Sequence, residues 1–201
     1  TAIDWTYEVR DMHLAVNAPM MGNMDTTITF PSAAFGTDGK GNVTRKPAAS
    51  DVMPGIPGIE SLFNVEQFFV PGVFANMKPG QTWETTSVDT NNNGGLEVVT
   101  TRTLRHTYQG KVDTLGTTAH RVHIEATTLT IAGAGNMQGM DMTMDGDGTI
   151  VSTSYVSSKD GMLLASNLDS EMTIRMSITG MGTEPMLIPM TTIQRATLVR
   201  K

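Results

Sequence analysis

The sequence predicts a mostly β protein built as one curved antiparallel sheet. The chain has 201 residues and nine prolines, but none of the prolines lies between Gly80 and Glu184. A long stretch without proline suits an uninterrupted sheet, because proline cannot donate to the ladder of hydrogen bonds. Within this stretch apolar residues recur at every second position, which is typical of strands with one buried and one solvated face. Short turn signals separate the apolar runs, so we expect an up-and-down meander of about seven or eight strands that curls into a half-barrel.

The first expected element is a strand that begins at Ile3. Apolar residues occupy odd positions over residues 3–9 and even positions over residues 12–16. One extra residue near Asp11 would produce this change of phase, so we expect a β-bulge there. Residues 24–35 are expected to form the partner strand.

Residues 36–75 are expected to interrupt the sheet as a lid-like insertion within one β domain that spans residues 1–201. Residues 36–58 show neither strand nor helix periodicity and end in closely spaced prolines and glycines, which predicts a long surface loop. The apolar residues of the segment 59–69 follow helical spacing, which predicts one short helix.

The remaining strands follow as a regular series. They are expected near residues 81–90, 96–108, 117–131, 140–156, 162–178 and 187–199, many of them rich in Thr, Val and Ile. The alternation is clearest over residues 162–178, where even positions should be buried and odd positions from Asn167 onward should be exposed. Turns are expected at residues 90–95 and 109–111, and a short hairpin is expected at residues 157–161.

Charge and composition exclude several classes of function. The net charge is −6, from 20 acidic and 14 basic residues without a block of like charges, so no nucleic-acid partner is expected. The apolar run 68–74 is far too short to span a membrane as a helix. No cysteine is present, which excludes disulfides and thiolate chemistry. The chain starts without methionine and is poor in lysine, so we expect an exported protein, periplasmic or on the outer surface of a bacterium.

Methionine is the compositional outlier, with sixteen residues gathered mainly in three clusters. Met140, Met142 and Met144 should project from the same side of one strand, and thioether sulfur is a soft ligand that suits Cu(I). Successive side chains on one face of a strand lie about 7 Å apart, so a copper site would also need Met172 or Met176 from a neighbouring strand. We expect instead that methionine fills a curved core or an adaptable ligand surface, and that the chain holds no metal or cofactor.

Other candidate chemistry is weak. His120 and His123 would share one face of a helix, but their surroundings read as a strand, where they face opposite sides. The Asp-Gly repeat at residues 145–148 lacks the ligand spacing of a calcium loop and is expected to kink a strand. Tyr155 and Lys159 have the spacing of a short-chain dehydrogenase pair but straddle a strand end. Because nucleophile elbows and phosphate loops are also absent from the sequence, we expect no enzyme.

The segment 77–83, MKPGQTW, and the closing meander resemble uncharacterised bacterial envelope proteins. The order of elements is more distantly similar to the half-barrel of the lipoprotein carriers LolA and LolB. This resemblance implies a concave apolar face under a lid and a binding role, and it assigns no functional residue.

Two functions therefore compete, with Cu(I) handling through the methionine clusters as a third. The first is a binding module whose concave face holds a lipid-like ligand or an apolar segment; its expected ligand-binding residues are Met140, Met142, Met144, Leu168, Met172, Met176 and Phe63. The second is a structural or accessory subunit that docks on a larger cell-envelope or extracellular assembly through Phe68, Phe69 and Phe74. The sequence does not separate these two, because an apolar stripe that receives a ligand looks like one that receives a partner.

Overall fold

The computed structural model describes residues 3–18, 22–28, 33–37, 43–45, 74–93, 95–137, 139–159, 161–179 and 186–200. These residues are almost entirely β-strand, which confirms the predicted fold class. The long strands are β1 (Ile3–Ala18), β5 (Thr82–Asn93), β6 (Leu96–Thr114), β7 (Thr117–Met137), β8 (Met140–Ser157), β9 (Leu163–Thr179) and β10 (Met186–Arg200). The short strands are β2 (Gly22–Ile28), β3 (Ala33–Thr37) and β4 (Val43–Arg45), and one 3-10 turn, η4, spans Phe74–Asn76.

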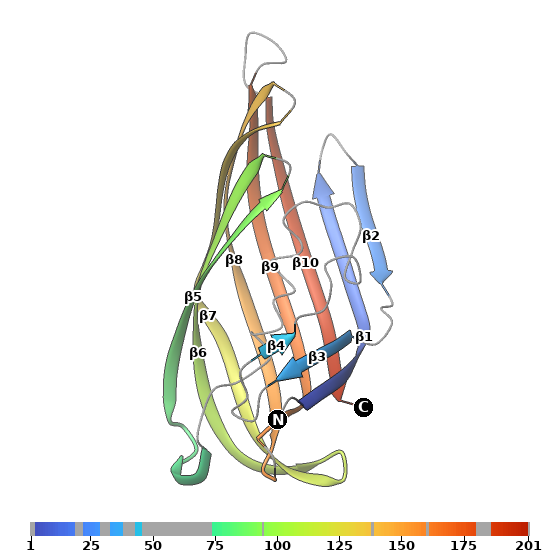
Figure 1. The fold of residues 1–201 in the computed structure, drawn as a ribbon, viewed down its shortest axis with the longest axis vertical. Coiled ribbons are helices and arrows are strands. Elements are labelled where there is room, and N and C mark those ends of the chain that lie inside the picture. Colours follow the sequence, from blue (N-terminus) through green and yellow to red (C-terminus); the bar gives the residue numbers. More distant parts are fainter. Residues whose placement is uncertain are drawn as a thin grey trace.

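All ten of these strands belong to one antiparallel sheet (Figure 1). From β5 to β10 each strand pairs with the next along the chain, which is the predicted meander. Strands β5–β10 run along the long axis of the molecule and twist strongly around one another, whereas β3 and β4 lie across it (Figure 1). Among the described residues the path of paired strands starts at β4 and ends at β5, so the sheet stays open and does not close into a barrel.

The first and last strands pair with each other, which the alternation pattern did not predict. The β1·β10 ladder runs from Tyr7 opposite Arg200 to Asn17 opposite Thr191, with a shift of register between Arg10 and His13. This shift confirms the bulge predicted near Asp11.

The expectation of a single partner strand over residues 24–35 is wrong. Two short strands take its place: β2 pairs with residues 12–18 of β1, and β3 pairs with residues 3–7. A bulge bends its strand. The two halves of β1 therefore run in different directions on either side of the bulge, and each takes its own short partner.

The predicted turn at residues 109–111 is also wrong, because β6 continues to Thr114. Gly110 has a φ of 104° and sits at a shift of register against β7, so Gln109 is the extra residue of a bulge. The chain reverses at Leu115 and Gly116, whose φ angles of 50° and 74° are those of a two-residue hairpin turn. Leucine gives no turn signal, which is why the sequence pattern missed this position.

The expected insertion is only partly described. Residues 36–37 belong to β3 and residues 43–45 to β4, so the loop predicted over 36–58 is wrong at these positions. The local pairing of β3 with β4 gives them strand structure although the sequence shows no period. The rest of that loop and the predicted helix 59–69 lie outside the described residues.

The alternation in β9 confirms the predicted faces. Leu168 and Met172 are 3% and 1% exposed, while Asn167, Asp169 and Glu171 between and beside them are exposed. From Ile174 to Ile178 the even positions are half-buried instead of buried. The sheet therefore has one buried face along most of its length, and that face becomes more open near the β9–β10 end.

Glycines allow the strands to curl tightly around this buried face. A Cβ atom on Gly146 of β8 would lie 2.5 Å from the carbonyl oxygen of Thr173 and 2.9 Å from Cγ2 of Ile131. Gly133, Gly135 and Gly148 are similarly close to neighbouring strands. Glycine at such positions marks a close approach of another backbone. The Asp-Gly repeat 145–148 thus lies inside a strand, as predicted, and lets the neighbouring strands approach. Its ladder with β9 runs through these residues without a shift of register, so no bulge accompanies the expected kink.

Candidate functional site on the concave face

The buried side of the curled sheet, called here the concave face, collects side chains of one parity from each strand. It receives even-numbered residues from β6, β8, β9 and β10 and odd-numbered residues from β5. The opposite, convex face is polar and carries rows of cross-strand ion pairs. Arg105 lies 3.3 Å from Glu84 and 3.2 Å from Glu125, one on each neighbouring strand. Water and cross-strand ion pairs account for the polar side chains of the convex face. The search for a binding or catalytic site therefore turns to the concave face.

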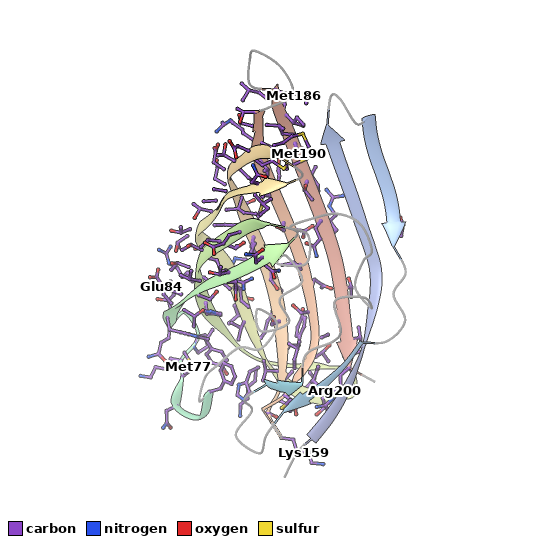
Figure 2. The ribbon with its side chains drawn as sticks, turned by 45° about the horizontal axis from the view of Figure 1, so that its top comes forward. Met77, Glu84, Lys159, Met186, Met190 and Arg200 are labelled. Carbon is purple, nitrogen blue, oxygen red and sulfur yellow. The ribbon has the colours of Figure 1, made fainter. Side chains whose placement is uncertain are left out.

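One end of the concave face is an apolar surface that is only half-buried, called here the methionine patch. It comprises Met140, Met142, Ile174, Met176, Ile178, Met186, Ile188 and Met190. Pairing of β8, β9 and β10 places these side chains in rows, with Met142, Ile178 and Met186 adjacent in one row. Met186 and Met190 lie at one end of the molecule, far from Lys159 and Met77 at the other end (Figure 2).

The predicted ligand-binding residues are spread over the patch and the buried part of the same face. Met140, Met142 and Met176 belong to the methionine patch, and Met144 lies beside them with 6% exposure. Leu168 and Met172 lie further along β9 and are buried. Phe63 lies outside the described residues.

The register also bears on the copper hypothesis. Met144 of β8 lies directly opposite Met176 of β9, so thioethers from two strands are neighbours. In the described part of the chain no group of three His, Cys, Asp or Glu side chains could hold a metal ion.

The other end of the concave face holds five ring side chains, called here the aromatic cluster: Phe74, Trp83, His106, Tyr108 and His120. The ring of Phe74 stacks on His120 with centroids 4.7 Å apart, and Trp83 stacks on His106 at 5.0 Å with only 7° between the ring planes. The hydroxyl of Tyr108 lies 3.0 Å from Nδ1 of His120. The cluster thus joins η4 to β5, β6 and β7.

Burial keeps both histidines of the cluster mainly neutral. Nε2 of His106 forms a 2.8 Å hydrogen bond with the hydroxyl of Thr85, and desolvation lowers the pKa of His106 to about 4. The pKa of His120 is lowered by burial and, to a smaller extent, by the positive charge of Lys111. Neither ring is therefore a strong proton acceptor at neutral pH.

Buried polar side chains lie between the two ends. The hydroxyl of Ser166 lies 3.0 Å from those of both Ser152 and Ser154. The guanidinium of Arg102, 3% exposed, forms an ion pair with Asp89, and its Nε donates to the hydroxyl of Ser87 at 2.8 Å. These groups satisfy one another, as buried polar groups generally must.

Sequence reasoning missed the central pair of the aromatic cluster. The sequence patterns assign no role to either Trp83 or His106. The parity of β6 could have found His106, because it shares its face with Leu104 and Tyr108. Phe74 was expected to anchor a partner, but it is 8% exposed and packs within its own chain. Phe68 and Phe69 lie outside the described residues.

The sequence predicts that His120 and His123 face opposite sides of one strand. His120 and His123 point to opposite faces of β7, as predicted, since His120 is buried and His123 lies on the convex side at half burial. They therefore share no site.

Comparisons with protein-family models, with curated proteins and with solved structures found no match. Among the described residues, no helix has the length and apolar character needed to cross a membrane.

Proposed function

We propose that this chain is a non-catalytic binding module that holds an apolar, lipid-like ligand on its concave face. The methionine patch carries this proposal. Eight large apolar side chains lie together and half-exposed on a curved surface, whereas exposed apolar residues on the convex face are scattered. A contiguous exposed apolar patch on a protein generally marks a binding site.

The composition of the patch suits a ligand of variable shape. Five of its eight side chains are methionines, namely Met140, Met142, Met176, Met186 and Met190. The thioether chain is flexible and polarizable, so methionine surfaces adapt to different apolar partners. Concave, mostly apolar surfaces with few polar groups are also the usual form of small-molecule sites.

The polar groups of the face support binding rather than catalysis. The hydroxyls of Ser152, Ser154 and Ser166 bond to one another instead of to a basic side chain. His106 is neutral, buried and stacked against an indole ring. An activated nucleophile needs an adjacent base. The hydroxyl of Thr85 has Nε2 of His106 within reach at 2.8 Å, but a pKa of about 4 makes this imidazole a weak base.

Two neighbouring residues of β10 provide a matched test. Ile188 belongs to the methionine patch, whereas Leu187 is 70% exposed on the convex face. We expect Ile188→Gln to weaken the binding of the apolar fluorophore N-phenyl-1-naphthylamine at least about tenfold, because burying one such side chain contributes roughly 1.5–3 kcal/mol. Leu187→Gln should leave the affinity unchanged.

Native mass spectrometry of the protein from its source completes the test. A co-purifying lipid mass supports the binding module. A stable assembly with other chains and no affinity for the fluorophore would overturn it in favour of an accessory subunit. Equal effects of the two glutamine substitutions would also contradict the proposal, since only one of them alters the concave face.

A further inference from the structure

Two ring nitrogens in the aromatic cluster are buried without a hydrogen-bond partner among the described residues: Nε1 of Trp83 and Nδ1 of His106. His106 is 2% exposed, and bulk water reaches neither atom. An unsatisfied buried polar group costs free energy, so each such group in a folded protein requires an explanation.

The two nitrogens belong to one small unit of structure. Trp83 of β5 lies directly opposite His106 of β6, and their rings are stacked with centroids 5.0 Å apart. Thr85, the next residue of β5 on the same face, holds the other nitrogen of His106 at 2.8 Å. Thr85 therefore holds the histidine ring in one orientation, and the stacked pair leaves one unpartnered nitrogen on each ring.

The chemistry of the pair selects the kind of head group. The indole N–H is a donor only, so it requires an acceptor such as oxygen. In the neutral imidazole, Nδ1 of His106 is a donor if Nε2 accepts the hydrogen bond from Thr85, and an acceptor if Nε2 donates it. A hydroxyl group satisfies either case, and a carbonyl oxygen satisfies the case in which Nδ1 carries the proton. A carboxylate is disfavoured, because a buried anion needs a cation, and the nearby buried guanidinium of Arg102 is already paired with Asp89.

We propose that Trp83 and His106 form the polar end of the ligand site and bind an uncharged oxygen, a hydroxyl or an ester carbonyl, at the head of a lipid-like molecule. This inference rests on the proposed function and specifies its substrate class. Apolar side chains line the face from this pair toward the methionine patch, including Leu104, Ile131 and Met172. The distance along β6 from His106 to Val98, beside the patch, is about 27 Å, the scale of a long acyl chain.

The experiment compares probes that share one chain and differ in the head group. We expect the wild-type protein to bind 1-dodecanol and methyl dodecanoate at least tenfold more tightly than dodecanoate at pH 8, measured by displacement of N-phenyl-1-naphthylamine. Trp83→Phe and His106→Phe keep a ring in place but remove the nitrogens. Each should weaken dodecanol binding up to about tenfold relative to the fluorophore, the value of one neutral hydrogen bond.

His123→Phe is the matched control, because His123 lies on the opposite face of β7 and should have no effect. A second measurement uses wild-type protein and does not depend on the folding of any variant. In ¹H–¹⁵N spectra, dodecanol should shift the indole N–H signal of Trp83, assigned through Trp83→Phe or by sequential connectivity.

The outcomes separate this inference from the proposed function. If the fluorophore binds but both phenylalanine variants bind dodecanol as the wild type does, the polar end is wrong and the apolar site stands. If dodecanol does not shift the indole N–H signal of Trp83, the two nitrogens do not bind the head group, and the proposed polar end is also wrong. If neither the fluorophore nor any dodecyl probe binds, both proposals fail.

Discussion

Two neighbouring residues of β9 test whether the parity of the strands fixes the two faces of the sheet. Leu168 is 3% exposed on the concave face, and Asp169 projects from the convex face. Leu168→Asp should destabilise the fold severely, whereas Asp169→Leu should change its stability little. The two substitutions exchange the same residue types at adjacent positions, so composition cannot account for a difference.

The expected magnitudes follow from burial and contacts. Removing a buried leucine side chain costs about 2–5 kcal/mol, and an unpaired buried carboxylate adds to that cost, so Leu168→Asp should lose at least about 4 kcal/mol. This corresponds to a fall in Tm of roughly 8–16 °C for a domain of this size. Asp169 is 3.4 Å from Arg195, but both side chains are about two-thirds exposed, and such an ion pair contributes at most about 1 kcal/mol.

Thermal unfolding followed by circular dichroism measures both variants. Leu168→Asn separates the size of the new side chain from its charge. Burial should raise the pKa of the introduced aspartate in the folded state, so Leu168→Asp should recover stability relative to Leu168→Asn as the pH falls through that pKa. Melting temperatures within about 3 °C of each other for Leu168→Asp and Asp169→Leu would refute the assignment of the faces.

Four further changes test other features. Leu115→Asn should stabilise the fold by about 1 kcal/mol in urea unfolding, because asparagine tolerates the positive φ of this turn and leucine does not; no gain would contradict the turn geometry. Gly146→Ala should cost more stability than Gly133→Ala, since its Cβ would lie 2.5 Å instead of 3.1 Å from a carbonyl oxygen, and the reverse order would refute the close approach. Burial lowers the pKa of His106 to about 4, so between pH 6.5 and pH 4 the unfolded chain binds a proton at this histidine and the folded chain does not. The free energy of unfolding should therefore fall by about 2 kcal/mol from pH 8 to pH 5. His106→Phe should reduce this dependence of stability on pH. Cu(I) titration under reducing conditions should show no tight stoichiometric site, and one that disappears in Met176→Leu would prove the methionines to be ligands.

Local alternation predicted the features that depend on one strand at a time. The faces of β9 and the bulge in β1 both follow from the period of the apolar residues, because burial of one face fixes the register of each strand. The turn at Leu115 and Gly116 escaped prediction because leucine is not a turn residue. There the pairing of β6 with β7 across the hairpin outweighs the local preference of the side chain.

The candidate site depends on the register between neighbouring strands, and the alternation of apolar residues within one strand does not predict that register. Trp83 and His106 meet only because the β5–β6 ladder ends with Asn93 opposite Leu96, whereas the asparagine-rich run allowed a turn at any position from residue 90 onward. The methionines could be assigned to one face of each strand but not to shared rows, since rows require the register of three strands. Export, the class of ligand and the absence of catalysis stay predictions.

The ladder between β1 and β10 has a consequence for how the chain folds. Strands β1–β4 pair among themselves, and β5–β10 pair in sequence, so each group can form from contacts between nearby segments. The β1·β10 ladder joins residues from almost opposite ends of the chain, so we expect it to close last. Until then each group exposes an unpaired strand edge, and β10 of one molecule can accept β1 of another. A swapped dimer that exchanges β1–β4 is therefore the characteristic misfolded product to expect at high concentration during refolding.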